Sequence, residues 1–272
     1  MNDLSRQSFL GADCDMVVTG TTAAIVGLCG GGSHVAQQLA HIGIGRFVLC
    51  DPDVVEGSNL NRMVGAVAGD AVLSRAKVDV IAERILAINP AAEIARCKGP
   101  WQEFSGELRG ATSVFGCVDN YADRAQLETM CRRFLIPYID IGMDVTEFGS
   151  GGFAISGQVI VSMPGRACMR CLGFLTDALL TAEAQRYGAA GGKPQVVWPN
   201  GVLASAAVGK FMSMILPWYG CGTGPAIMTE YDGNTGQLFA SRRLLTLEGR
   251  RCAHFDGPDD LGDPFFRLLP GA

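Results

Sequence analysis

A glycine-rich turn between a predicted buried strand and a predicted helix is the feature that most constrains this chain. Residues 22–28 form an apolar run, residues 33–42 read as a helix, and between them lies Gly27-Leu28-Cys29-Gly30-Gly31-Gly32. Glycine lets a backbone approach a phosphate closely, and a helix N-terminus offers unpaired N–H groups to an anion. Asp51 follows the next predicted strand, where a carboxylate can accept hydrogen bonds from ribose hydroxyls. The pattern predicts a Rossmann-like nucleotide-binding unit, which an NAD enzyme would share.

Short apolar runs alternate with amphipathic segments through the first half of the chain. Strands are predicted over residues 46–50, 94–97, 114–118 and 138–141, and helices over 74–89 and 124–134. The helix over 74–89 has apolar side chains at helical spacing, namely Val78, Ile81, Ile85 and Ile88. Strands that alternate with helices predict an α/β fold, in which a mostly parallel sheet has helices on both faces.

The pattern changes after Asp140. Residues 148–162 are rich in glycine and β-prone, helices are predicted over 181–187 and 202–216, and a hairpin is predicted over 227–231 and 237–240. We therefore expect a mixed or antiparallel C-terminal extension of the same sheet, within one domain covering residues 1–272. The expected parts are an N-terminal arm (1–20), a nucleotide-binding half (21–141), a second half (142–255) and an irregular tail (256–272).

Composition and charge limit the classes of partner. Hydrophobic residues make up 48% of the chain and charged residues 18%, which is enough for a folded core. The net charge of −5 argues against nucleic acid or an anionic membrane as the main partner. No apolar run approaches the ~20 residues of a membrane span, and residues 1–6 lack the layout of a signal peptide. We therefore expect a cytoplasmic protein.

Charged and polar side chains follow the predicted strands at the edge where the glycine turn lies. Asn59-Leu60-Asn61-Arg62 comes after the second strand, Ser74-Arg75-Ala76-Lys77 begins the next helix, and Asp119-Asn120 ends the fourth strand. Arg62 and Lys77 can neutralise a triphosphate, and the Asp119 carboxylate can hold Mg²⁺ between phosphate oxygens. A dehydrogenase has no need of these cations, so the set favours ATP over NAD. Each residue alone could equally be a solvated charge or a helix cap.

Taken in order, these motifs resemble those of the ThiF/MoeB/HesA adenylyltransferase family, whose fold is shared by ubiquitin-activating enzymes. The resemblance covers roughly residues 4–220, and beside the glycine turn it rests on Asp51-Pro52-Asp53-Val54-Val55-Glu56, Asn59-Leu60-Asn61-Arg62, Ala76-Lys77-Val78, Asn89-Pro90, Val118-Asp119-Asn120 and Cys168-Met169-Arg170-Cys171. It implies that Asp51 binds ribose and that Asp119 holds Mg²⁺. The other implied nucleotide contacts are Gly27, Gly30, Gly32, Asn59, Arg62, Lys77 and Asn120.

The resemblance also implies a reaction and its partners. Family members use ATP and Mg²⁺ to adenylate the C-terminal carboxylate of a small ubiquitin-like or sulfur-carrier protein ending in Gly-Gly, and they release pyrophosphate. Residues 142–255 would then be the carrier-binding half. Leu4-Ser5-Arg6-Gln7 resembles the family's N-terminal segment, whose arginine reaches the ATP of the other subunit. Arg6 thus joins Arg62, Lys77 and Asp119 as a catalytic candidate, and a homodimer is expected.

The cysteines divide into two kinds. Cys50, Cys97, Cys117 and Cys131 lie in or beside apolar runs and are expected to be core thiols. Cys168-Met169-Arg170-Cys171 has the spacing of half a tetrahedral zinc site. Relatives supply a second such pair near the C-terminus, where this chain has Cys252 followed by His254 and Phe255. We expect a structural zinc ion bound by Cys168, Cys171, Cys252 and His254, with Cys221 as a weaker candidate ligand.

Two departures from the family pattern keep other functions open. Cys29 replaces a glycine of the turn, and residues 176–200 lack the cysteine that many relatives use for a covalent intermediate. The adenylate would then pass directly to an acceptor, or another nucleophile such as Ser205 or Cys221 would act. Alternative functions are adenylation of a peptide or of a tRNA-borne carboxylate, non-catalytic binding of a carrier, and NAD-dependent oxidation. Intact Arg62, Lys77 and Asp119 argue against the last two.

Overall fold

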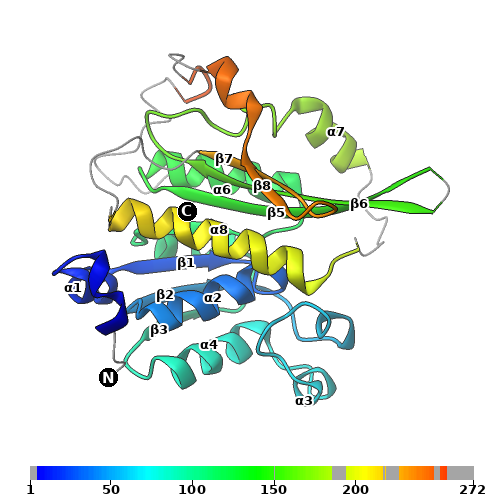
Figure 1. The fold of residues 1–272 in the computed structure, drawn as a ribbon. Helices are drawn as coiled ribbons and strands as arrows, with labels where there is room; N and C mark the ends of the chain where they lie inside the picture. The colour runs from blue at the N-terminus through cyan, green and yellow to red at the C-terminus, as the bar shows by residue number, and fades with distance from the viewer. Residues whose placement is uncertain are drawn as a thin grey trace.

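In the computed structural model, one eight-stranded sheet runs through the described part of the chain, which comprises residues 5–149, 151–185, 194–216, 218, 227–247 and 252–255. The strand order is β3-β2-β1-β4-β5-β6-β7-β8 (Figure 1). The strands with parallel pairing are β1 (Thr22–Val26), β2 (Arg46–Cys50), β3 (Glu93–Cys97), β4 (Ser113–Gly116) and β5 (Tyr138–Phe148). The antiparallel extension consists of β6 (Gly152–Ser162), β7 (Met228–Asp232) and β8 (Gln237–Ala240). The predicted fold class is confirmed.

Helices cover both faces of this sheet. One face is covered by α2 (Gly30–Ile42), α4 (Lys77–Ile88) and α8 (Val197–Ile215), and α6 (Tyr121–Arg133) lies behind the sheet in Figure 1. The shorter described elements are η1 (Ser5–Leu10), α1 (Cys14–Gly20), η2 (Gly57–Asn59), α3 (Ala68–Val72), η3 (Trp101–Phe104), α5 (Ser105–Leu108), α7 (Asp177–Gln185) and η4 (Arg242–Leu247). No described helix is both long and apolar enough to cross a membrane.

Two hydrophobic cores follow from the alternation of side chains along each strand. Ala23 and Ile25 of β1 pack with α2, α4 and α8, whereas Ala24 and Val26 face the side of α6. Both sets are buried because the central strands are apolar on both faces, as is typical of parallel sheets. Cys50, Cys97 and Cys131 are buried in the second core, as predicted, and Cys117 packs half-buried against the first.

Several element boundaries differ from the predicted ones. The helix predicted over 74–89 begins at Lys77, because Ser74 has a φ of +46° and Ala76 a ψ of 132°, neither of which is helical. The helix predicted from residue 124 begins at Tyr121, because Asn120 caps it. Helix α8 begins at Val197, five residues before the predicted start. The helices α1, α3 and α5 were not predicted, and the predicted tail over 256–272 lies outside the described residues.

A buried ion pair joins α6 to the middle of the sheet. Arg124 of α6 donates to the Asp140 carboxylate of β5, and its Nη2 atom also donates to the carbonyl oxygen of Val118 at 2.6 Å. The Tyr138 hydroxyl donates to Asp140 at 3.1 Å. Burial raises the pKa of Asp140, and Arg124 opposes this shift. Because both charges are almost completely buried, each depends on the other for compensation.

Asp140→Ala should lower the free energy of unfolding by about 3–5 kcal/mol, because it leaves the Arg124 guanidinium buried without its counter-ion. Urea unfolding measures the change. Asp144→Ala is the control, since Asp144 is an exposed carboxylate on the same strand and its loss should change stability by less than about 0.5 kcal/mol. Equal losses in the two variants would contradict this role of the pair.

Candidate functional site: a nucleotide cleft and a Cys/His metal centre

A cleft of about 960 Å³ opens at the carboxyl-terminal edge of the parallel strands. Its walls come from the turns after β1, β2 and β4, from the start of α6 and from β5. The structure brings together in this cleft most of the predicted site residues, namely Gly27, Gly30, Asp51, Asn59, Arg62, Lys77, Asp119 and Asn120. Side chains that the sequence did not single out also line it, among them Asp53, Asp123, Arg124, Gln158 and Asn200.

The glycines of the turn leave room for neighbouring groups that approach them closely. Gly27 has a φ of +87°, and a Cβ atom there would lie 2.5 Å from the carbonyl oxygen of Cys117. A Cβ at Gly32 would lie 1.8 Å from the carbonyl oxygen of Gly27, so Gly32 shapes the turn although it does not line the cleft. A Cβ at Gly30 would meet the Asn200 side chain at 2.7 Å. Cys29, which replaces a family glycine, lines the cleft at the N-cap of α2.

Asp51 links the turn after β1 to the turn after β2. One carboxylate oxygen accepts the Leu28 N–H at 2.7 Å, and the other accepts the Asp53 N–H at 2.9 Å. Asp51 is buried, and burial raises the pKa of its carboxyl, while Lys77 opposes the shift. The carboxylate therefore holds the nucleotide-side turns together, and its predicted contact with ribose stays a prediction.

Lys77 is held in the cleft by two carboxylates. Its Nζ atom lies 2.7 Å from Asp53 Oδ2 and 3.9 Å from Asp51 Oδ1. Burial by itself lowers the pKa of Lys77, but Asp51 and Asp53 outweigh this effect and raise it. Lys77 therefore stays protonated at the base of the cleft. Asp53 was not predicted as a partner of Lys77, although the two residues flank the same strand edge.

Arg62 has a buried donor that is free for an anion. Its Nη1 atom donates to the Ser58 carbonyl oxygen at 2.7 Å and to Asn61 Oδ1 at 3.0 Å. Its Nε atom is buried and has no hydrogen-bond partner among the described residues. A buried donor without a partner is costly, so an acceptor in the cleft, such as a phosphate oxygen, would relieve that cost.

Asn59 and Asn120 both support local structure. Asn59 is buried, and its side-chain oxygen accepts the Glu56 N–H at 2.9 Å, which closes the turn before Arg62. Asn120 caps α6: its oxygen accepts the Asp123 N–H at 2.6 Å, and its amide donates to the Asp123 carboxylate at 2.6 Å. Asp119, one residue earlier, is exposed in the cleft. These two asparagines thus shape the turns from which Arg62 and Asp119 project.

Arg6 does not line the cleft of its own chain. It is exposed in η1, and the neighbouring Gln7 donates to the Ile42 carbonyl oxygen at 3.3 Å, at the C-terminal end of α2. The cleft lies at the opposite end of that 13-residue helix, about 20 Å away. A contact between Arg6 and a nucleotide would therefore need the cleft of another copy of the chain.

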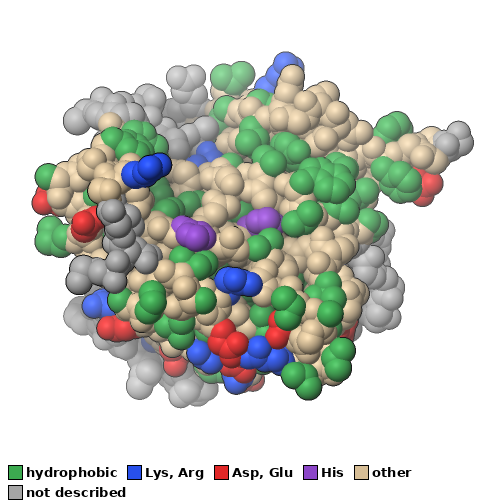
Figure 2. Space-filling view, turned by 60° about the horizontal axis from the view of Figure 1, so that its bottom comes forward, with side chains coloured by type: hydrophobic (Ala, Val, Ile, Leu, Met, Phe, Trp, Pro, Cys, Tyr) green, Lys and Arg blue, Asp and Glu red, His purple; other side chains and the backbone are tan. Residues whose placement is uncertain are grey.

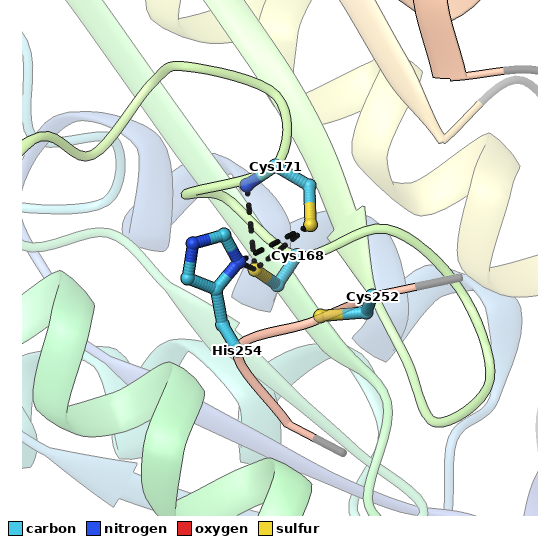
Figure 3. Close-up of side chains that lie close together, drawn as sticks. All are labelled: Cys168, Cys171, Cys252 and His254. Carbon is cyan, nitrogen blue, oxygen red and sulfur yellow. Dashed lines mark hydrogen bonds between the residues drawn. The ribbon is translucent and has the colours of Figure 1, made fainter. Parts of the chain in front are cut away.

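The four predicted zinc ligands come together, as Figure 3 shows. Cys168 and Cys171 lie on the loop after β6, and Cys252 and His254 lie on the C-terminal segment. Cys168 Sγ lies 3.6 Å from Cys171 Sγ and 3.5 Å from His254 Nδ1, and the four donor atoms all lie within 4.8 Å of one another. Three thiols and one imidazole are a ligand set that zinc prefers. The cluster can therefore hold zinc, and Cys221 lies outside the described residues.

Two buried residues of α6 support this cluster. The Glu128 carboxylate accepts the Met169 N–H at 2.8 Å, and Arg132 donates to the carbonyl oxygens of Arg166 and Ala167, both at 3.1 Å. Burial raises the pKa of Glu128, while Ser162 and Met169 oppose the shift through hydrogen bonds. These contacts hold the loop that contains Cys168. Neither residue was predicted to support the cluster, since a Glu and an Arg four residues apart are typical of an exposed helix face.

Among the described residues, the charged side chains on the face shown in Figure 2 form no separate binding site. Acidic and basic side chains lie intermixed there. Ion pairs in and around α4 join Arg75 to Asp70 and Glu83, and Asp79 to Lys98. The described side chains on this face therefore form no continuous basic surface of the kind that binds nucleic acid.

A Rossmann-like sheet with a glycine turn and a charged cleft at its strand ends defines a nucleotide-binding α/β protein. The ThiF family model matches residues 6–252, and the chain belongs to the ThiF family.

Three curated proteins are similar to this chain in sequence over about half of its length. The chain is 33% identical over 165 residues to ubiquitin-like modifier-activating enzyme 5 of Oryza sativa subsp. japonica, covering 54% of this chain and 37% of the relative. It is 32% identical over 141 residues to tRNA threonylcarbamoyladenosine dehydratase of Haemophilus influenzae, covering 51% of each. It is 31% identical over 166 residues to molybdopterin-synthase adenylyltransferase of Escherichia coli, covering 59% and 62%. The matches thus span about two fifths to three fifths of these relatives.

A solved structure agrees in fold. The E. coli MccB structure crystallised with succinimide has a TM-score of 0.70 and 18% sequence identity, covering 89% of this chain and 72% of MccB. At this identity the likeness concerns the fold alone. It agrees with the α/β fold described above.

The Cys/His cluster is predicted to bind zinc. The purified chain should contain one zinc ion, and Cys252→Ser should weaken zinc binding by more than about tenfold, since loss of even an outer-shell partner has that effect. Metal analysis and competition with a chelating dye measure this. Cys29→Ser is the control, because Cys29 is a thiol outside the cluster. Zinc should also dissociate as pH falls, because protons compete for the thiolates and the imidazole. Equal zinc affinity of Cys252→Ser and Cys29→Ser would refute the ligand set.

Proposed function

We propose that this chain uses ATP and Mg²⁺ to adenylate the C-terminal carboxylate of a small ubiquitin-like or sulfur-carrier protein ending in Gly-Gly, with release of pyrophosphate. The observation that supports this most is the buried Nε donor of Arg62, which has no hydrogen-bond partner in the described part of the chain and lies in a cleft that begins at a glycine turn. The names of the relatives from Oryza sativa and Escherichia coli support the same class of reaction.

The cleft has too few cations of its own to neutralise a bound triphosphate. Among the described lining residues, the carboxylates outnumber the cations six to three. The carboxylates belong to Asp51, Asp53, Glu56, Asp119, Asp123 and Asp144, and the cations are Arg62, Lys77 and Arg124. Lys77 and Arg124 are already paired with carboxylates. A bound triphosphate would thus need further cations to reduce the repulsion.

Asp119 and Arg6 are the residues proposed to meet this need. Asp119 is an exposed residue at the edge of the cleft beside the start of α6, and a carboxylate is the ligand type that Mg²⁺ prefers. When bound, Mg²⁺ supplies charge neutralisation at the phosphate oxygens. Arg6 would enter from a second copy, because its own cleft is out of reach, and this supports the proposed homodimer.

The proposed reaction requires the protein mainly to position the carrier carboxylate and the phosphates. A carrier carboxylate oxygen forms a bond to the α-phosphorus, the bond from that phosphorus to the bridging oxygen of the β-phosphate breaks, and pyrophosphate leaves. Arg62 and Lys77 would hold the phosphates in line with the incoming carboxylate. No proton has to be removed from an ionised carboxylate, so the reaction needs no histidine or serine base. Residues 142–255 are the part proposed to bind the carrier.

A second candidate is adenylation of a tRNA-borne carboxylate. The specific support is the 32% identical relative named tRNA threonylcarbamoyladenosine dehydratase. The net charge of −5 and the intermixed charges in Figure 2 make it the weaker candidate.

ATP–pyrophosphate exchange with candidate carriers tests the proposal. Exchange should require Mg²⁺ and a carrier with a free Gly-Gly terminus, and Asp119→Ala or Arg62→Ala should slow it by about a hundredfold or more, since each removes preorganised charge stabilisation. Asp13→Ala, an exposed carboxylate far from the cleft, is the control. Exchange supported by tRNA and by no carrier would favour the second candidate, and exchange unchanged in Asp119→Ala would refute the role of Asp119.

A mixing experiment tests the contribution of Arg6. Arg6→Ala and Asp119→Ala should each retain about a hundredth of wild-type activity or less when assayed alone. After subunit exchange the mixture should regain about a quarter of wild-type activity, because half of the dimers are mixed and one of their two sites is intact. A mixture that stays inactive although the subunits exchange would show that Arg6 does not act across the dimer.

A further inference from the structure

Helix α7 contacts the start of α6, close to the cleft. It follows the loop that contains Cys168 and Cys171, and Figure 1 shows it at the upper right, beside the antiparallel part of the sheet. None of its nine residues is buried. Leu180 and Glu183, three residues apart on one helix face, are half-buried and the other seven are exposed. Because no side chain of α7 is fully buried, its polar contacts contribute strongly to where it lies.

Glu183 makes the contact that joins α7 to α6. Its Oε1 atom accepts the Tyr121 N–H at 2.9 Å, and its Oε2 atom accepts the Ala122 N–H at 2.9 Å. These are the first two N–H groups of α6, and Asn120 accepts the third, from Asp123. The first N–H groups of a helix have no partner within the helix, and a carboxylate there also favours the positive end of the helix dipole. Together the two side chains complete the N-terminal cap.

The same turn contains the proposed magnesium ligand. Asp119 lies two residues before Tyr121, and Asp119, Asn120 and Tyr121 all line the cleft, whereas Glu183 does not. On the other side of the turn, Asp123 accepts hydrogen bonds from the Trp101 and Gln102 side chains, each at 3.0 Å. The start of α6 is thus held by η3 on one side and by α7 on the other.

The charge of the Glu183 carboxylate bears on the binding of Mg²⁺ beside α6. The N-terminus of α6 has a positive partial charge, which would oppose a divalent cation bound at Asp119 nearby. The Glu183 carboxylate compensates this charge at the amides themselves. Phe174 adds to the contact, since its ring centroid lies 5.9 Å from that of Tyr121, and Phe174 itself lines the cleft.

We infer that Glu183 is a positioning residue, which fastens α7 to the first turn of α6 and thereby fixes the Asp119–Asn120 turn for binding of Mg²⁺ and ATP. The inference rests on the proposed function for the roles of Mg²⁺ and ATP, and on the hydrogen bonds alone for the fastening. Glu183 touches neither nucleotide nor reacting carboxylate in this scheme, so it acts through the backbone of α6.

Hydrogen–deuterium exchange on the full chain without nucleotide tests the fastening. In Glu183→Ala the amides of Tyr121 and Ala122 should exchange about fivefold faster, the size expected when a helix cap is lost. Glu183→Gln should fall between this variant and the wild type, because its amide oxygen still accepts one hydrogen bond. Asp177→Asn is the matched control: it removes an acidic charge from the same helix, where Asp177 pairs with Arg170 at the surface. Unchanged exchange in Glu183→Ala would overturn the inference.

Calorimetry of ATP binding at varied Mg²⁺ tests the positioning. The Mg²⁺ concentration needed for half-maximal binding should rise about fivefold in Glu183→Ala, again the effect of a lost cap, and stay at the wild-type value in Asp177→Asn. Faster amide exchange with an unchanged Mg²⁺ requirement would overturn the positioning role. Because this measurement needs no carrier, a chain that binds Mg²⁺ and ATP normally but shows no pyrophosphate exchange with any carrier would refute the proposed substrate and leave this inference standing.

Discussion

Asp140 lies on β5, the strand with a parallel neighbour on one side and an antiparallel neighbour on the other, and Arg124 reaches it from α6. The same guanidinium donates to the carbonyl oxygen of Val118, just after β4. One buried cation thus holds the end of a parallel strand, a helix and the first antiparallel pair in a single arrangement. Because a buried charge cannot be left without its partner, this junction has few alternative geometries. The cleft depends on it, since Arg124 lines one wall.

The cleft combines a few cations with a larger number of carboxylates. Lys77 is held by Asp53 and Asp51, and the Nε donor of Arg62 is buried without a partner among the described residues. Such a site is poorly suited to a polyanion unless further cations enter with it. The proposed roles of Mg²⁺ and of a second copy's Arg6 follow from this shortage of positive charge as much as from resemblance to the family.

Helix α6 runs from the cleft to the loop of the Cys/His cluster and contacts both. Its first turn borders the cleft and is capped by Asn120 and Glu183. Farther along, Glu128 and Arg132 hold the loop that contains Cys168. The segment from Cys168 to Glu183 is therefore attached to α6 at two places, one beside the Cys/His cluster and one beside the cleft. A structural metal in the cluster would stabilise this segment at one end, while Glu183 fastens it at the other.

The sequence by itself determined the fold class, the strand β2 to the residue and the edge of the sheet at which most of the site residues gather, because apolar periodicity and glycine turns are local properties. The Cys-x-x-Cys spacing also determined half of the metal cluster. Only the tertiary structure decided that Asp53 holds Lys77, that Asp140 compensates Arg124 and that Glu183 caps α6. These partners lie 16 to 62 residues apart in sequence, and no local pattern specifies which buried charge meets which.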